Sequence, residues 1–561
     1  MPFSSLFSQP SSYTPVAARD TNDTTTHEDA LNDETRNLIA PEDQLQLNDI
    51  ATTKFVYILV FSTCIGGFLF GYDTGIISGA LQPLQEEYGL GTMQKEFIVG
   101  GTTFAAIFGG LGAGMVRLLS MVISSAAGRK ALVLFASVVF IVGAIILGLA
   151  TGYSTLLIGR LVVGFGVGIA SMIIPMYISE VAPRTLRGQL STINTLMVTF
   201  GQVVAYLINI AFAKADDGWR YMFGLAALPA IFQCFALALV PESPRYLIAN
   251  GETLRAQAIL REVYGDAVSE GFIDQEVSSI QDSIKQESEG VSFSELFNQV
   301  NRRPLFIACI LQAAQQLSGF NTAMYYAATI MQMAGFRDHG DSTTVALIVA
   351  STNMIFTAIA IKTIDRVGRR RLLVSTMFVM ILGLLALGSS FASLQGLVPK
   401  QDTCELYGSN CARCVLDERC GWLTMGDTCN VIKGHEQDLY QSPTGCPPEF
   451  HGPVISTSLL VSLFVYVASY ALGLGYAPWL IQSELFSMQV RGKANGLATA
   501  VNWTCNLIIA TTFLSLADAL STAVTFWLYA VISFAFWVLV VRMVPETKGK
   551  SLEDIQSLFH H

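Results

Sequence analysis

The sequence predicts an all-α membrane protein with about twelve transmembrane helices in two six-helix halves and a small disulfide-rich extracytoplasmic insert. The composition supports a membrane protein, because 52% of the 561 residues are hydrophobic and only 14% are charged. The mean hydropathy is +0.49, well above that of soluble chains. Two motifs recur at one spacing along the chain, which indicates the two halves. Six of the ten cysteines lie in a single connection, which indicates the insert.

Apolar stretches of roughly the 20 residues that span a bilayer occur on both sides of a polar central segment. A soluble protein would have to bury all of them without lipid, so we reject that class. The stretches of the first half are Phe55–Leu81, Phe97–Met115, Ala131–Ala150, Ser154–Ile178, Leu190–Phe212 and Tyr221–Val240. Those of the second half are Pro304–Met333, Thr344–Ile364, Leu372–Leu394, Val454–Ile481, Ala494–Leu516 and Ala523–Val544.

Basic residues fall in alternate connections, which the positive-inside rule places in the cytosol. Both termini are then cytosolic, and the net charge of −10 comes from solvated segments, the N-terminal tail and Glu252–Glu289. No apolar stretch of a cleavable signal peptide opens the chain, so the first helix is expected to act as the signal. The basic residues are Arg129, Lys130, Arg184, Arg187, Arg302, Arg303, Arg366, Arg369–Arg371, Arg491, Lys493, Lys548 and Lys550.

Two motif pairs indicate a duplication. Ser179-Glu180 recurs as Ser483-Glu484, and Pro241-Glu242-Ser243 recurs as Pro545-Glu546-Thr547; 483 − 179 and 545 − 241 both equal 304. The triplets that begin at Gly128 and Gly368 are only 240 residues apart (368 − 128), so the second half carries an insertion of 304 − 240 = 64 residues. The predicted parts are a disordered cytosolic tail 1–53, a first half 54–241, a central loop with helices 242–303, a second half 304–396 and 453–545, an insert 397–452, and a tail 546–561.

The cysteines of the insert are expected to form three disulfides. The insert lies on the oxidising side and has little apolar core, the setting in which disulfides stabilise small modules. A zinc site at the Cys-x-x-Cys pair is the alternative. The six are Cys404, Cys411, Cys414, Cys420, Cys429 and Cys446.

Several motifs resemble the sugar-porter branch of the major facilitator superfamily over nearly all of 54–552. Within that branch, Asp73 and the cysteine-rich loop look most like the animal proton/myo-inositol cotransporters, and the cysteine pattern resembles a plexin-semaphorin-integrin (PSI) module. The motifs are Gly66-Gly67-Phe68-Leu69-Phe70-Gly71-Tyr72-Asp73, Gly159-Arg160-Leu161, Pro175-Met176-Tyr177-Ile178-Ser179-Glu180, Pro241-Glu242-Ser243-Pro244-Arg245, Gln315-Gln316-Leu317-Ser318-Gly319 and Pro545-Glu546-Thr547.

Asp73 is the candidate proton-coupling residue, because a carboxylate inside a membrane is costly unless it is paired or protonated. The resemblance implies that proton-coupled members carry Asp here where many uniporters carry Asn, and that its partner is Arg160. Protonation of Asp73 would release Arg160 and ease the change between outward-open and inward-open states. The alternative is a static buried ion pair that holds two helices together.

The resemblance also implies a set of polar residues that bind solute hydroxyls near the midplane. Because Gln315 and Gln316 are adjacent on a helix, we expect one to point into the cavity and the other to reach its rim. Interhelical hydrogen bonding is the alternative role. Thr195 stands where hexose carriers commonly place Gln, which favours a different polyol. The set is Gln202, Gln315, Gln316, Asn321, Tyr325, Asn353, Trp479 and Asn502.

A cytoplasmic gate is implied by charged residues that would bridge the halves when the inner gate is closed. The stretch Arg117–Ala127 lacks the Asp that usually precedes the Gly-Arg-Arg motif, which puts the first-half network in doubt. In the central loop, helical spacing around Ala256 and Leu260 predicts a cytosolic helix. The gate residues are Glu180, Arg187, Glu242, Asp365, Arg366, Arg369, Glu484 and Arg491.

The function expected from the resemblance is proton-coupled symport of myo-inositol or a related polyol or sugar by alternating access. The alternatives are facilitated hexose uniport and a nutrient receptor with vestigial transport, whose insert would bind a protein ligand. We expect no enzyme activity, no cofactor, no metal and no nucleic-acid partner. The partners are the solute, protons and the lipid bilayer. The plasma membrane is expected, and an acidic dileucine pattern at Glu34 and Leu38-Ile39 makes an endolysosomal or vacuolar membrane the alternative.

Overall fold

The computed structural model describes residues 53–114, 128–183, 187–265, 268–288, 293–333, 339–396, 414, 420–423, 428–431, 439–440, 453–486 and 488–548. The dileucine pattern and Arg117–Ala127 lie outside the described residues. In the described part, every apolar stretch predicted to span the bilayer coincides with helix.

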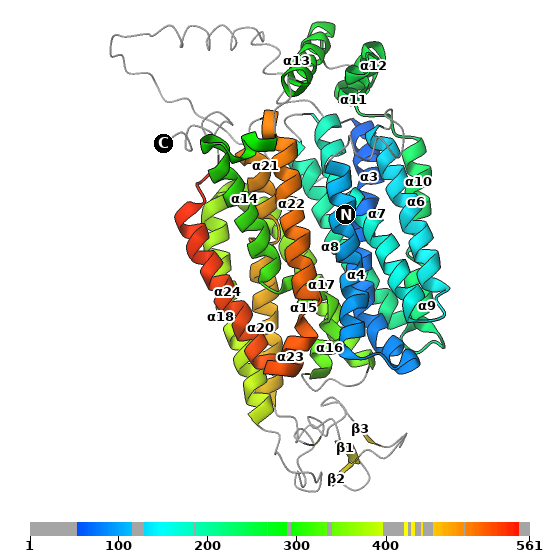
Figure 1. The fold of residues 1–561 in the computed structure, drawn as a ribbon, viewed down its shortest axis with the longest axis vertical. Helices are drawn as coiled ribbons and strands as arrows, with labels where there is room; N and C mark the ends of the chain where they lie inside the picture. Colours follow the sequence, from blue (N-terminus) through cyan, green and yellow to red (C-terminus); the bar gives the residue numbers. More distant parts are fainter. Residues whose placement is uncertain are drawn as a thin grey trace. The chain divides into compact units, whose positions relative to one another are not determined.

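The first half consists of long helices that pack side by side (Figure 1). They follow from runs of apolar residues that a bilayer and neighbouring helices bury together. The first helix ends at Gly89, whose left-handed backbone (φ 62°) gives its N–H to the carbonyl of Gln85. The helices are α3 (Lys54–Tyr88), α4 (Thr92–Gly114), α6 (Arg129–Gly148), α7 (Tyr153–Val181), α8 (Arg187–Phe212), α9 (Gly218–Gly224) and α10 (Ala227–Ala238).

The second half repeats this plan with more breaks. The stretch 304–333 is divided at Gly319, which has a left-handed backbone (φ 81°). Two helices of the eleventh stretch, Val490–Ala510 and Phe513–Leu520, meet at a bend of 41°. The helices are α14 (Gln299–Leu317), α15 (Phe320–Tyr325), α16 (Ala327–Met333), α17 (His339–Val367), α18 (Arg369–Gly396), α20 (Pro453–Leu472), α21 (Ala477–Leu485), α22 (Met488–Ala510), α23 (Phe513–Leu520) and α24 (Thr522–Met543).

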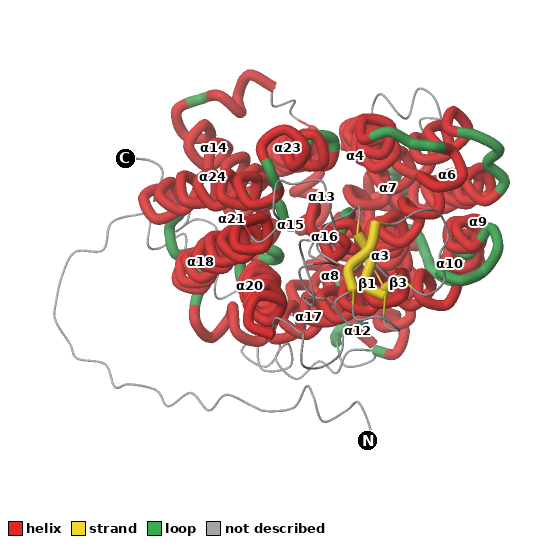
Figure 2. The backbone as a smooth tube through the Cα atoms, turned by 90° about the horizontal axis from the view of Figure 1, so that it is seen from below, coloured by secondary structure: helices red, strands yellow, loops and turns green. Residues whose placement is uncertain are grey.

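Among the described residues, nine helices are long and apolar enough to cross a membrane, or ten if the bent pair is one span. The remaining predicted spans coincide with α4 and with the interrupted series α14, α15 and α16. The two halves meet where α4 packs against α22 and α8 packs against α17. Viewed along the helices, α18, α20, α21 and α24 lie on one side and α6, α7, α9 and α10 on the other (Figure 2).

Close backbone approach holds α3 against α8. Gly67, Gly71, Gly75 and Gly79 recur every four residues on one face of α3. A Cβ atom at Gly71 would overlap the backbone of Val198 in α8. Small residues at this spacing allow membrane helices to pack closely. The contact fixes the position of Asp73 relative to α8, because Asp73 lies two residues beyond Gly71 on the same helix.

The central loop forms the predicted helices α11 (Pro244–Ala249), α12 (Thr253–Tyr264) and α13 (Glu270–Ser288), followed by the 3-10 helix η3 (Phe293–Phe297). Ala256 and Leu260 are buried, as their spacing predicts. Thr53 donates a hydrogen bond to the carbonyl of Glu262, which ties α12 to the start of α3. We call this end of the helices, where α3, α6 and α18 begin, the basic end, and the opposite end, where α18 leads into the insert, the insert end.

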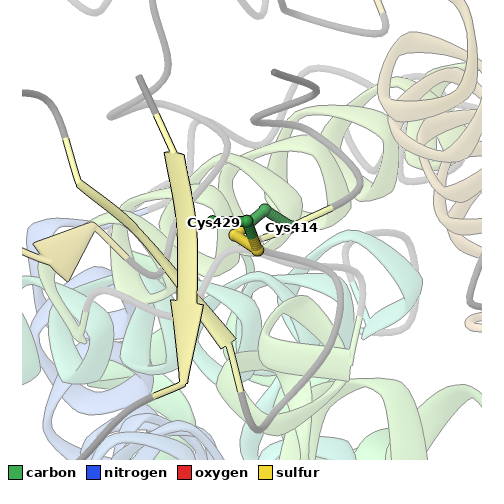
Figure 3. The surroundings of a disulfide bond; sticks show 2 residues. All are labelled: Cys414 and Cys429. Carbon is green, nitrogen blue, oxygen red and sulfur yellow. A yellow bond between two sulfur atoms is a disulfide. The ribbon is translucent and has the colours of Figure 1, made fainter. Parts of the chain in front are cut away.

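The insert contains a small antiparallel sheet, which the predicted all-α class did not include. Its order is β2-β1-β3, with β1 (Cys420–Leu423), β2 (Thr428–Val431) and β3 (Leu439–Tyr440). A disulfide joins Cys414 to Cys429 of β2 (Figure 3). Cys420 is also disulfide-bonded, whereas Cys404, Cys411 and Cys446 lie outside the described residues.

Candidate functional site

Asp73 and Arg160 form a buried ion pair between α3 and α7. Nη1 of Arg160 donates to Oδ1 of Asp73 at 2.6 Å, and the two residues are 5% and 0% exposed. Arg160 also donates from Nε to the carbonyl of Ile98 at 3.0 Å. Its Nη2 has no hydrogen-bond partner among the described atoms. The Nη2 group of Arg160 can therefore donate to another acceptor if its neighbours move.

Tight packing of α4 against α7 holds this arginine in place. A Cβ at Gly164 would overlap the backbone of Thr102, so glycine permits the close contact. Thr102 donates from its hydroxyl to the carbonyl of Arg160 at 3.4 Å. The pair is thus fixed by three helices of the first half, α3, α4 and α7. Such a pair depends on good geometry and additional hydrogen bonds to offset the cost of taking two charges out of water.

Asn502 of α22 connects three glutamines of α14. Its amide nitrogen donates to Gln312 at 2.7 Å and to Gln315 at 2.9 Å, and its oxygen accepts from Gln316 at 3.0 Å. Gln316 also accepts from Asn321 of α15 at 2.7 Å. Both glutamines of the adjacent pair therefore bond to the same asparagine. The three glutamines and Asn502 are buried and use one another as hydrogen-bond partners.

Gln315 also fixes the break between α20 and α21. Its amide nitrogen donates to the carbonyls of Leu474 and Gly475, both at 2.9 Å. Its oxygen accepts from the indole of Trp479 at 3.1 Å. Trp479 is 36% exposed, in contrast to the buried amides. The cluster therefore joins the interrupted parts of the second half, where backbone groups are free of helix bonding.

Two of the predicted residues join the halves. Asn353 of α17 donates to Gln202 of α8 at 3.0 Å, and both are buried. Tyr325 of α15 accepts from Asn506 of α22 at 3.2 Å. All predicted solute-binding residues thus lie in the described part of the chain, and each hydrogen-bonds to another polar side chain of the set or of its neighbours. Thr195 is half-buried on α8.

Three members of this polar cluster were not predicted from the sequence: Gln312, Gln482 and Asn506. Gln312 donates to Gln482 at 2.5 Å. Gln312 lies three and four residues before the Gln315-Gln316 pair, so all three share one face of α14. That spacing was visible in the sequence. The contribution of Gln482 required the fold, because it comes from the interrupted helix α21.

The first-half charges at the basic end form a network despite the atypical connection before Gly128. Arg129 donates to Glu180 through Nε and Nη2, at 3.1 Å for the ion pair. Glu242 accepts from the backbone N–H of Lys130 at 3.1 Å. Ser243 donates to Glu180 at 2.5 Å. The described members of the first-half network therefore bond to one another, although the sequence before Gly128 lacks the usual aspartate.

The second half repeats the pattern at the duplicate positions. Arg369 pairs with Glu484 at 3.4 Å, and Thr547 donates to Glu484 at 2.6 Å. Glu546 accepts from the backbone N–H groups of Arg369 at 2.9 Å and Arg370 at 3.1 Å. Each of these ion pairs lies within one half, so in this conformation they do not bridge the halves.

The other predicted gate residues have different surroundings. Arg491 donates from Nε and Nη2 to the carbonyl of Phe486, at 3.2 and 3.0 Å. Arg366 is exposed, and its carbonyl accepts from Lys548 at 2.7 Å. The side chains of Arg187 and Asp365 lie outside the described residues. Among the described side chains, Arg129 is the cation that pairs with Glu180.

Comparison with known proteins places this chain in a family. The family model described as "Sugar (and other) transporter" matches residues 59–401 and 439–559. The chain belongs to this sugar transporter family and is an integral multi-pass membrane protein. It is a transporter by family, not an enzyme.

Similar curated proteins are named as inositol transporters. The chain is 40% identical to "Myo-inositol transporter 1" of Cryptococcus neoformans, over 90% of this chain and 82% of that one. It is 36% identical to the human "Proton myo-inositol cotransporter", over 92% of this chain and 83% of that one. Among solved structures, the proton:xylose symporter XylE with a bound bromodeoxyglucose matches at 27% identity and a TM-score of 0.67, covering 90% of this chain and 99% of that one.

Proposed function

We propose that this chain carries myo-inositol or a related polyol together with protons by alternating access. The buried Asp73–Arg160 pair at 2.6 Å is the observation that carries the coupling part of the proposal. The names of the similar proteins support an inositol-like solute and cotransport with protons. Hexose uniport is the competing function, in which the same pair serves only to hold α3 against α7.

Coupling follows from the charge balance of the pair. While Asp73 is ionised, it holds Arg160 and the first half keeps one arrangement of α3, α4 and α7. A proton bound to Asp73 removes the negative charge, and Arg160 can then use its spare Nη2 donor elsewhere. Because the energy of the pair differs between the two conformations, a proton gradient can drive solute movement.

Solute binding follows from the amide cluster. Side-chain amides and hydroxyl groups both donate and accept hydrogen bonds. A cluster of amides is therefore suited to a solute whose ring carries several hydroxyl groups. The amides are those of Gln312, Gln315, Gln316 and Asn502. Asn353 and Gln202 add an amide pair across the halves. A solute that bonds to both halves at once links its own binding to their relative movement.

Orientation and location complete the proposal. The basic end is cytosolic, which places both termini in the cytosol and the insert outside it. The plasma membrane is the proposed location, with an endolysosomal or vacuolar membrane as the alternative. The domain limits and the three disulfides of the insert stay predictions.

The test is uptake of radiolabelled myo-inositol into proteoliposomes, with glucose as the comparison solute, with and without a proton gradient. We expect wild-type protein to accumulate inositol only with the gradient. Asp73→Asn keeps the shape of the side chain but cannot be ionised, so it should still exchange inositol at equal concentrations and lose gradient-driven accumulation. Accumulation by this variant at the wild-type level would contradict the assignment and favour coupling elsewhere. Wild-type uptake that ignores the gradient would favour uniport.

A further inference from the structure

The two halves are joined at the insert end by hydrogen bonds from several helices. The backbone N–H of Ala328 in α16 donates to the hydroxyl of Ser78 in α3 at 3.0 Å. Tyr206 of α8 donates to the carbonyl of Met324 in α15 at 2.6 Å. The insert end is therefore closed in this structure, and these contacts have to separate when it opens in an alternating-access cycle.

Glu96 also joins the halves at the insert end. Among the hydrogen bonds between described residues there, its contact is the one that uses a buried carboxylate. Glu96 lies in the first turns of α4 and is 3% exposed. Its two oxygens accept from the backbone N–H of Ser515 at 2.8 Å and from the Ser515 hydroxyl at 2.6 Å. Ser515 belongs to the first turn of α23, where N–H groups have no partner within the helix. Glu96 of the first half thus caps a helix of the second half.

The charges around Glu96 do not neutralise it through an ion pair. None of the ion pairs found among the described residues includes Glu96. The neighbouring Lys95 donates to Gln85 at 3.0 Å. Asp518, one turn further along α23, accepts from Thr92 at 2.9 Å. The carboxylate is therefore bonded by Ser515 at the positive end of the α23 dipole, and Lys95 attracts it at longer range than an ion pair. Hydrogen bonds to a charged group are stronger than neutral ones.

The duplication does not repeat the serine of this contact. The duplicate of Ser515 in the first half is 304 residues earlier, at Ala211, which has no hydroxyl group. The basic-end networks repeat in both halves, whereas the serine of this contact occurs in only one. A contact that joins the halves at one end stabilises only the conformations in which that end is closed.

We propose that Glu96 and Ser515 form a clasp that holds the insert end closed and breaks each time that end opens. The clasp is a positioning device for the transport cycle and does not touch the solute. It rests on the proposed alternating-access function. By stabilising one conformation, it sets how often the insert end opens in the absence of solute.

The test measures opening directly. The reporter substitution Ala328→Cys places a thiol at a position that is 3% exposed in the closed insert end. The rate of its modification by a maleimide in purified protein reports opening, after subtraction of the rate in protein without the reporter. We expect Glu96→Gln and Ser515→Ala each to raise the rate about five- to tenfold, because each removes a charge-assisted bond. Ser515→Thr keeps both donors and should label at the parent rate.

Thr92→Ala is the matched control. It removes the exposed bond between the same two helices, and exposed contacts contribute little, so its rate should stay near the parent rate. Unchanged labelling in Ser515→Ala, or an equal rise in Thr92→Ala, would overturn the clasp. If Glu96→Gln does not fold, Ser515→Ala alone decides the outcome. The assay uses neither solute nor proton gradient, so it can fail or succeed independently of the symport test.

Discussion

At the scale of single residues, Asn502 is the position that can distinguish the proposed solute binding from helix packing alone. It bonds to Gln312, Gln315 and Gln316 at 2.7–3.0 Å. Gln233 of α10 is a buried amide of the other kind: it accepts from Ser137 at 3.0 Å and donates to the carbonyl of Thr63 at 3.2 Å. Both are buried, but only Asn502 belongs to a cluster of several side-chain amides.

The first residue-scale prediction concerns Asn502→Ala. The change removes one partner of three glutamines and one group proposed to meet the solute, so the KM for inositol uptake should rise about tenfold or more, equivalent to about 1.4 kcal/mol. Gln233→Ala is the control, which should lower the unfolding temperature and leave KM near the wild-type value. An unchanged KM in Asn502→Ala, with normal protein levels, would assign the cluster to helix packing.

At the scale of elements, two glutamate carboxylates cap the N-termini of helices α6 and α18. Glu242 accepts from the N–H of Lys130 at the start of α6, and Glu546 accepts from the N–H groups of Arg369, Arg370 and Arg371 at the start of α18. First-turn N–H groups lack partners within the helix, and a negative charge there also meets the positive end of the helix dipole. The repeated Pro-Glu motif thus caps one helix of each half at the basic end.

The element-scale prediction follows from the pKa of Glu546. Burial raises this pKa, but the backbone N–H groups of Lys548, Arg369, Arg371 and Arg370 outweigh burial and hold it below its ordinary value. A lowered pKa means that the cap stabilises the fold above the ordinary glutamate pKa of about 4.3, and that this contribution is lost as the pH falls through the lowered folded-state value.

Glu546→Gln should therefore unfold about 2 °C below wild type at pH 7, and the difference should shrink at acid pH. Unfolding temperatures of the detergent-solubilised proteins measure it across the pH range. Asp282→Asn removes an exposed ion pair of α13 at 3.7 Å and should behave as wild type throughout. A gap between Glu546→Gln and wild type that widens toward acid would contradict the assignment.

At the scale of the whole molecule, the insert is an addition to a duplicated bundle. The helices on either side of it, α18 and α20, pack against each other directly. The insert has its own sheet and its own disulfide between Cys414 and Cys429. The contact between α18 and α20 therefore does not involve the insert.

We expect replacement of residues 397–452 by a short Gly/Ser linker to preserve inositol uptake per molecule in proteoliposomes. Reduction of the insert disulfides in the complete chain should likewise leave uptake near its starting value. The control is Asp73→Asn in the shortened chain, which should lose accumulation as in the complete one. Loss of uptake in a shortened chain that is folded and reconstituted would give the insert a part in transport and strengthen the receptor alternative.

The sequence by itself determined the family, the spanning segments and the duplicated motifs, because apolar length and fixed spacing are properties of one stretch of chain at a time. It also pointed to Asp73 and Arg160, since a charge inside an apolar helix is visible without a fold. Only the tertiary structure decided the partners. Glu180 pairs with Arg129, 51 positions away, and Glu96 meets Ser515 across 419 positions. Such pairings depend on which helices become neighbours, and no local pattern records that.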